Sequence, residues 1–121
     1  MTVREAKEVV WEWVIQKASK TSDFCGAFYH GSVNWLAEDT LLPATSDVDI
    51  IVVFADQPHS SPGKFNYENV ILEVSYLSII QLPSAEQILG QYYLAGSFRQ
   101  PNIIADPAGH FQHWVGHFTF V

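Results

Sequence analysis

The segment Ser46 to Phe54 reads Ser-Asp-Val-Asp-Ile-Ile-Val-Val-Phe, so two aspartates, Asp47 and Asp49, stand one residue apart at the start of a β-branched, apolar run. Such a run, bounded by polar residues, predicts a β-strand from Val48 to Phe54. Because strand side chains alternate between faces, both carboxylates project from the same side. Two acids placed there repel each other and resist burial unless a cation or hydrogen-bond donors compensate their charge.

A divalent cation would provide that compensation. Mg²⁺ prefers hard oxygen ligands and typically takes one or two carboxylates, with water and substrate phosphates in its other positions. The alternative is that Asp47 caps the start of the strand while Asp49 faces solvent, as acids beside turns often do. The spacing alone does not separate these interpretations, because two acids one residue apart are common by chance.

Upstream, the residues Phe-Cys-Gly-Ala-Phe-Tyr-His at positions 24–30 predict another strand, and Gly31-Ser32 then precedes a short apolar stretch at 33–37 that predicts a helical turn. A strand, a Gly-Ser pair and a helix start form an arrangement that can cradle phosphate. Glycine lets the backbone approach a ligand, Ser32 offers a hydroxyl and an N–H, and a helix N-terminus directs free N–H groups at an anion. An ordinary turn is the alternative.

Downstream, residues 69–77 predict a second apolar strand that is interrupted by one charge, Glu73. A lone carboxylate in such a strand is costly unless it is paired, solvated or bound to metal. If the two strands are neighbours, Glu73 completes a cluster of three carboxylates with Asp47 and Asp49. Alternatively, Glu73 is an edge-strand charge that discourages aggregation.

Together, Gly31-Ser32, Asp47-Val48-Asp49 and Glu73 resemble the DNA polymerase beta-like nucleotidyltransferase superfamily, whose pattern is Gly-Ser, a spacer, an acid-x-acid strand and a third acid on a nearby strand. The resemblance covers about residues 24–77. Weaker similarity at 92–98 and 103–109 points to its bacterial aminoglycoside-type and minimal branch. The resemblance implies an α+β fold, with a small mixed β-sheet flanked by helices as in the polymerase beta palm.

The resemblance also implies a function. It implies transfer of a nucleoside monophosphate from an NTP such as ATP to a hydroxyl of a small acceptor. In this interpretation Asp47, Asp49 and Glu73 are the catalytic residues and bind one or two Mg²⁺ ions, while Gly31 and Ser32 bind phosphate. Glu73 is either a ligand of the second metal ion or the base that accepts the acceptor's proton.

An alternative function is a catalytically weak or inactive nucleotidyltransferase-like protein that binds or regulates a second chain, in the manner of an antitoxin. The spacer between Ser32 and Asp47 is slightly long, and it carries Glu38 and Asp39 where many relatives have neutral or basic residues near the triphosphate. That branch also usually continues into a helical region. We therefore expect residues 1–121 to form one nucleotidyltransferase-like domain without that region.

Charge narrows the substrate class. The net charge is −7, and four of the six basic residues lie in the first twenty positions. Polymeric nucleic acid normally requires a basic track, so we expect none as substrate. A small or cationic acceptor suits an acidic surface better, although acidity that serves only solubility would look the same.

Hydrophobic residues make up 48% of the chain, which predicts one compact domain with a core. No window approaches the length of a membrane span and no basic-then-apolar leader precedes the first strand, so we expect no membrane association and a cytoplasmic location. The single cysteine, Cys25, excludes an internal disulfide and is expected in the core.

Two helices, a loop and a strand are also predicted. Apolar spacing from Val3 to Lys20 predicts an amphipathic helix that packs on the sheet. Residues 84–94 predict a second helix, which begins at a capping-box pattern and stops near Gly96. Residues 57–63 predict a loop, and residues 102–105 a short strand.

The C-terminal segment carries three histidines at helical spacing, His110, His113 and His117. Imidazoles on one helix face could bind zinc. Aromatic residues at 111, 114 and 118 form an adjacent apolar stripe, and this favours a covering or interface role instead. We expect the stripe to contact the domain itself, a second copy or a protein partner.

Overall fold

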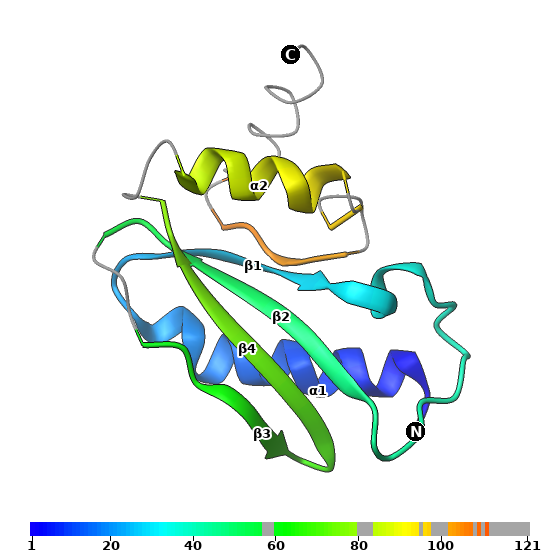
Figure 1. Ribbon diagram of the computed structural model, residues 1–121. Coiled ribbons are helices and arrows are strands. Elements are labelled where there is room, and N and C mark those ends of the chain that lie inside the picture. The colour runs from blue at the N-terminus through cyan, green and yellow to red at the C-terminus, as the bar shows by residue number, and fades with distance from the viewer. Residues whose placement is uncertain are drawn as a thin grey trace.

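The computed structural model describes residues 1–56, 60–79, 84–94, 96, 97, 102–107, 109 and 111. Within these residues a five-stranded sheet has the order β3-β4-β2-β1-β5 (Figure 1). The strands are β1 (Phe24–His30), β2 (Asp47–Phe54), β3 (Gly63–Tyr67), β4 (Val70–Ser78) and β5 (Ile103–Ala105). The helices are α1 (Val3–Gln16) and α2 (Ser84–Leu94), with the short 3₁₀ turns η1 (Ala18–Lys20) and η2 (Gly31–Trp35).

The sheet is mixed. The pairs β1 with β2, β1 with β5 and β3 with β4 are antiparallel, whereas β2 and β4 run parallel. The structure confirms the expected class, which is α+β with a small mixed sheet flanked by helices. Among the described residues, every helix is too short or too polar to traverse a bilayer.

Both faces of β2 are covered along most of its length, which explains its nearly continuous apolar run. On one face, alternate side chains of β2 lie in a buried cluster with the apolar stripe of α1, which consists of Val3, Ala6, Val10, Trp13 and Val14. On the other face, Ile51 and Val53 pack with Leu89 of α2 and with Phe111. Because strand side chains alternate, Asp47 and Asp49 share the face of Ile51 and Val53, opposite α1.

The first helix is shorter than predicted. A capping box of Thr2 and Glu5 starts α1 as a reciprocal pair of side-chain to backbone hydrogen bonds. The helix ends at Gln16 instead of Lys20, and η1 follows. The Ser19 hydroxyl donates to the Ile15 carbonyl oxygen at 2.6 Å. In a continuing helix, the backbone N–H of residue 19 would donate to this oxygen instead.

Strand β3 was not predicted, and residues 57–59 of the loop assigned before it lie outside the described residues. It forms a hairpin with β4 through Glu68 and Asn69, both of which have positive φ, as a two-residue type I′ turn requires. The predicted strand at 69–77 therefore begins one residue late, at Val70. The expected strand at 102–105 corresponds to β5, and α2 has the predicted bounds. All three C-terminal histidines, His110, His113 and His117, lie outside the described residues.

The described core predicts a clear contrast between two leucines. Leu72 on β4 is fully buried between α1 and the sheet, whereas the side chain of Leu41 is 73% exposed. Leu72→Ala should lower the free energy of unfolding by about 2–5 kcal/mol, because it removes buried methyl groups and leaves a cavity. Leu41→Ala should change it by less than about 0.5 kcal/mol. Urea denaturation measures both, and equal losses would contradict this assignment of the core.

Candidate functional site

The three predicted carboxylates meet on the open face of the sheet. Asp49 of β2 and Glu73 of β4 are direct partners in the parallel register, and Asp47 stands two residues earlier on β2. One carboxylate oxygen from each of the three residues lies within 4.8 Å of the others. The structure thus brings Asp47, Asp49 and Glu73 together, as the expectation of neighbouring strands required.

The proximity of these acids perturbs Asp49. Burial raises the pKa of its carboxyl group, and the charge of Glu73, a hydrogen bond with the Glu73 side chain and the charge of Asp47 raise it further. His30, the cross-strand neighbour of Asp49 on β1, acts in the opposite direction. The carboxyl group of Asp49 therefore loses its proton less readily than an ordinary aspartate. A bound cation would favour its ionised form.

Gly31 brings the backbone against this cluster. Its φ is +80°, and a Cβ atom placed on it would lie 2.9 Å from Asp49 Oδ2. A side chain at this position would therefore be strained and would displace the Asp49 carboxylate. The predicted helical turn after the strand is present as the 3₁₀ turn η2, which begins at Gly31.

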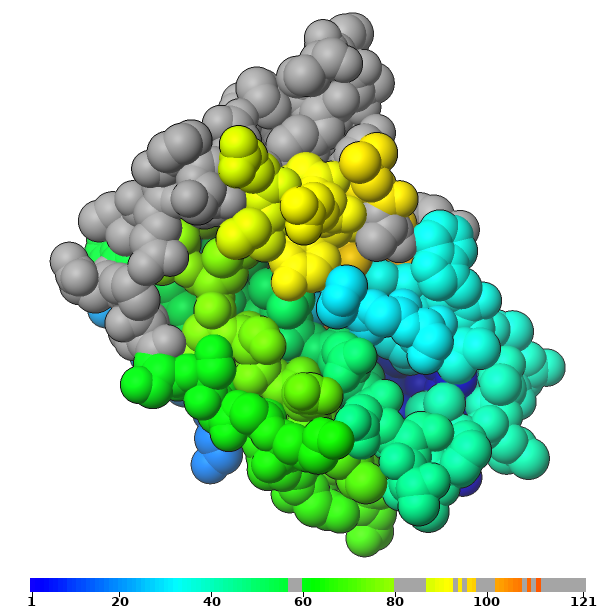
Figure 2. Space-filling model, viewed as in Figure 1, coloured from blue at the N-terminus to red at the C-terminus, as the bar shows by residue number. Residues whose placement is uncertain are grey.

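Two hollows adjoin the carboxylates. The first, of about 360 Å³, is lined by Ser32, Ser46 and Asp47 together with apolar residues of the loop before β2. The second, of about 180 Å³, is lined by Asp49, Glu73 and neighbours that include His30, Ser75 and Tyr92. Figure 2 shows this face of β2 and β4 open below α2 (yellow), between η2 (cyan) and β3 (green). The acids therefore lie between two spaces, and each space could receive one part of a substrate pair.

Lys64 on β3 is a further residue of this cluster, and the sequence did not reveal its place there. Its Nζ lies 2.7 Å from Asp47 Oδ2, and in the antiparallel register it stands opposite Glu73. The hydrogen bond to Asp47, followed by the charge of Asp47, raises the pKa of Lys64. Its role depends on β3, and without that strand no pattern in the sequence connects Lys64 to the acids.

His30 completes a row across the sheet, in which His30, Asp49, Glu73 and Lys64 are successive cross-strand neighbours on β1, β2, β4 and β3. The His30 ring lies edge-on to Tyr92 of α2, with ring centroids 4.8 Å apart. Its Nδ1 atom is buried and has no hydrogen-bond partner among the described residues. The row places a polar, weakly basic group at one end of the acids and an ammonium at the other.

A buried polar network holds η2 in place beside this row. The Asn34 amide donates to the Ser97 hydroxyl at 3.0 Å. The Asn102 amide donates to the carbonyl oxygens of Asn34 at 3.2 Å and Gly96 at 2.9 Å. These bonds join the turn that starts at Gly31 to the segment after α2. Side-chain networks of this kind connect residues far apart in sequence, so spacing patterns do not predict them.

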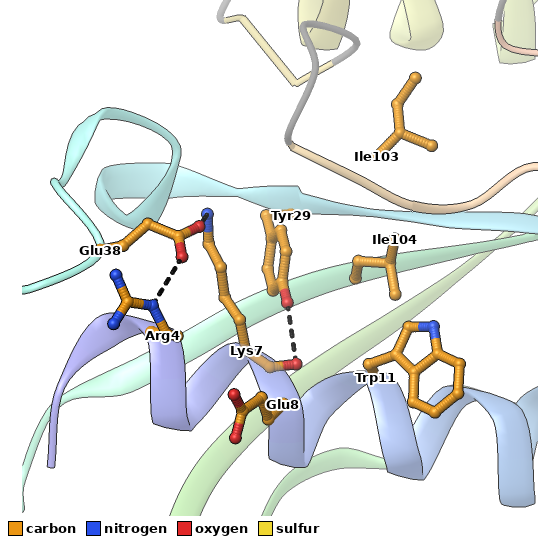
Figure 3. A pocket seen from close by; sticks show the side chains of 8 residues that line it. All are labelled: Arg4, Lys7, Glu8, Trp11, Tyr29, Glu38, Ile103 and Ile104. Atoms are coloured by element: carbon orange, nitrogen blue, oxygen red, sulfur yellow. Dashed lines mark hydrogen bonds and ion pairs between the residues drawn. The ribbon is translucent and has the colours of Figure 1, made fainter.

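Glu38 was expected to place unfavourable charge near a bound triphosphate. Its carboxylate instead pairs with Arg4 at 3.4 Å and Lys7 at 3.7 Å on α1 (Figure 3). Glu38 lines a different hollow, of about 390 Å³, between α1, β1 and β5. Its charge is compensated there by the two cations of α1, whereas Asp39, the other acid of the spacer, is exposed.

That larger hollow is another candidate ligand site. It is lined by Trp11 and Tyr29 as well as the two cations, and Lys7 Nζ lies 5.2 Å from the centroid of the Tyr29 ring (Figure 3). Both of its cations already pair with Glu38. Its lining carries two cations and two acids, Glu8 and Glu38, so its charges balance, in contrast to the excess of negative charge among Asp47, Asp49 and Glu73. The carboxylate cluster is therefore the better candidate functional site.

No protein-family model matches the chain, and no curated protein is significantly similar to it. The resemblance to nucleotidyltransferases thus stays a prediction drawn from residues 24–77. A fold alone does not specify a function, so the functional argument depends on the geometry of the carboxylates and their neighbours.

The contact between Gly31 and Asp49 can be tested against a second glycine. Gly63 also has positive φ, at +76°, but nothing lies within 4 Å of a Cβ atom placed on it. Gly31→Ala and Gly63→Ala should each lower the free energy of unfolding by about 1–2 kcal/mol through the left-handed backbone. Only Gly31→Ala should also shift the ¹³C resonance of the Asp49 carboxyl group in NMR spectra. An unchanged resonance in Gly31→Ala would show that the contact does not exist.

The raised pKa of Asp49 predicts a pH dependence of stability. The folded state holds this proton more tightly than the unfolded state, so stability falls as pH rises above the ordinary aspartate pKa of about 3.9. Asp49→Asn should therefore be more stable than the wild type at pH 7, and the difference should shrink toward pH 4. Urea denaturation at both pH values measures it, with Asp39→Asn as an exposed control. A wild type more stable than Asp49→Asn at pH 7 would contradict the raised pKa, to which burial and the neighbouring acids both contribute.

Proposed function

We propose that this protein is a Mg²⁺-dependent nucleotidyltransferase, which transfers a nucleoside monophosphate from an NTP to a hydroxyl group of a small acceptor. The convergence of Asp47, Asp49 and Glu73, with oxygens within 4.8 Å of one another, carries the proposal. The Gly31 turn beside Asp49 supports it, because it leaves backbone next to the acids with no intervening side chain.

The three carboxylates fit a divalent cation. Oxygen ligands of Mg²⁺ lie about 2.0–2.1 Å from the ion, so two of them are at most about 4.2 Å apart. Small side-chain rotations would bring the three oxygens within that range. Asp47, Asp49 and Glu73 would hold one or two ions. Bound Mg²⁺ would neutralise charge that develops on the phosphates and align the displacement of pyrophosphate.

The larger of the two adjoining hollows suits the nucleotide. Ser32 is exposed on η2 and lines it together with Ser46 and Asp47. The Ser32 and Ser46 hydroxyls can donate hydrogen bonds to phosphate oxygens, and Gly31 allows the backbone to approach them. Phosphates held there would lie next to Asp47, which is one of the three proposed metal ligands.

The smaller hollow suits the acceptor. Glu73 lines it beside Ser75, with the Tyr92 ring on the α2 side. Glu73 would accept the proton of the acceptor hydroxyl if that oxygen lies within about 3 Å, or would ligate the second ion. A volume near 180 Å³ admits a small group. The acidic surroundings favour an acceptor that carries positive charge.

A second candidate is a catalytically weak nucleotidyltransferase-like protein that binds a second copy or a partner chain, in the manner of an antitoxin. Exposed apolar side chains favour it. Trp35 is 61% exposed and Leu94 is 83% exposed. Such residues often mark protein interfaces, although single exposed apolar residues also occur without one.

Nucleotide binding separates these candidates. Isothermal titration of the wild type with ATP, GTP, CTP and UTP should show binding of at least one of them that requires Mg²⁺. Asp47→Asn/Asp49→Asn should weaken it by at least roughly 100-fold, since even outer-shell partners of a metal ion cost about 10–100-fold. Glu8→Gln, a change in an exposed acid of α1 on the other face of the sheet, should leave it unaltered. A wild type that binds none of the four with Mg²⁺ contradicts the enzyme and favours the binding protein.

A further inference from the structure

Lys64 crosses the sheet to reach the acidic cluster. It belongs to β3, and β4 lies between β3 and β2, yet its ammonium contacts Asp47 on β2. Neighbouring strands lie about 4.8 Å apart, so the Lys64 and Asp47 side chains together span roughly two strand spacings. A lysine side chain has four rotatable carbon–carbon bonds and loses conformational freedom when its ammonium is held in one place. The acids therefore attract this ammonium strongly enough to offset that loss.

The cluster thus already holds a cation, which is supplied by the protein itself. The ammonium lies 2.7 Å from Asp47 Oδ2, at hydrogen-bonding distance. Among the described residues, the site carries three carboxylates and this one ammonium. Negative charge remains in excess after the ion pair has formed, and most of it lies on the side of Asp49 and Glu73.

A divalent ion shared by the three carboxylates would come close to Lys64. The ion would need an oxygen of Asp47, and it would then repel the ammonium bound to the same carboxylate. Lys64 can leave at low cost, because its side chain is 57% exposed and it stands on an edge strand. Exposed ion pairs of this kind are weak.

A phosphate bound in the hollow beside Asp47 would offer Lys64 a second anion once it has left the carboxylate. Asp47 lines the hollow that contains Ser32 and Ser46, which is the proposed binding site of the nucleotide phosphates. Rotation of the lysine stem would carry Nζ from the carboxylate toward a phosphate oxygen in that hollow. An ammonium is a compact charge that binds phosphate well and does not require a fixed orientation.

We propose that Lys64 is an exchangeable counter-ion, which pairs with Asp47 in the empty site, yields Asp47 to the divalent ion, and then binds a phosphate of the nucleotide. This inference rests on the proposed nucleotidyltransferase function, because it takes the metal and phosphate positions from it. It assigns Lys64 two opposite effects. Lys64 competes with the free metal ion, and it assists the bound triphosphate.

Two titrations of the same variant test these opposite effects. In the first, Mn²⁺ alone is titrated into the protein and followed by electron paramagnetic resonance. Lys64→Gln should bind Mn²⁺ about two- to five-fold more tightly than the wild type, as expected when an exposed ion pair that competes is removed. In the second, inorganic tripolyphosphate is titrated at saturating Mn²⁺, so that base preference plays no part. Here Lys64→Gln should bind roughly ten-fold more weakly.

Two further variants serve as controls. Lys64→Arg retains the positive charge and should preserve most of the tripolyphosphate affinity, whereas Lys20→Gln removes an exposed cation from η1 and should change neither titration. Equal or weaker Mn²⁺ binding by Lys64→Gln, or unaltered tripolyphosphate binding, overturns the role of Lys64 while leaving the proposed function intact. If the wild type shows no Mn²⁺ binding that Asp47→Asn weakens, both the role of Lys64 and the proposed function are overturned.

Discussion

The parallel pairing of β2 with β4 is the constraint on which the site depends. Its register sets Asp49 directly beside Glu73, and strand alternation adds Asp47 on the same face. The same register buries Val48, Ile50 and Val52 against α1 together with Leu72 and Val74 of β4. A slip of one residue would turn these apolar side chains to the opposite face of the sheet and the acids toward α1. The energy of the core therefore fixes the position of three acids that repel one another.

The surrounding residues offset that repulsion in different ways. Lys64 supplies a positive charge from the far edge of the sheet, at 2.7 Å from Asp47. Gly31 leaves room for the Asp49 carboxylate at a place where a Cβ atom would intrude. Asp49 still holds its proton more tightly than an ordinary aspartate. The arrangement retains unfavourable charge that a divalent cation would relieve, and this is the physical basis of the proposed function.

Local pattern predicted the elements that are strongly periodic or β-branched, such as β2, α1 up to Gln16 and α2. It also placed Asp47, Asp49 and Glu73 on strands whose adjacency the structure confirms. It missed β3, because that strand has only five residues, follows the loop predicted at 57–63 and turns through Glu68-Asn69 without the usual glycine. Lys64 and the pairing of Glu38 with Arg4 and Lys7 were missed for a related reason. They depend on which segments become neighbours in space, which residue spacing does not encode.

The most direct measurement of the central claim is anomalous diffraction from crystals of the protein soaked in MnCl₂. A metal site shared by the three acids predicts one anomalous peak within about 2.5 Å of an oxygen of Asp47, of Asp49 and of Glu73, with Lys64 Nζ moved away from Asp47. Such a peak would show that the strand register places the three acids close enough to share one metal ion. Full Mn²⁺ occupancy elsewhere on the protein, with no peak between these carboxylates and the Lys64 to Asp47 pair intact, would contradict it.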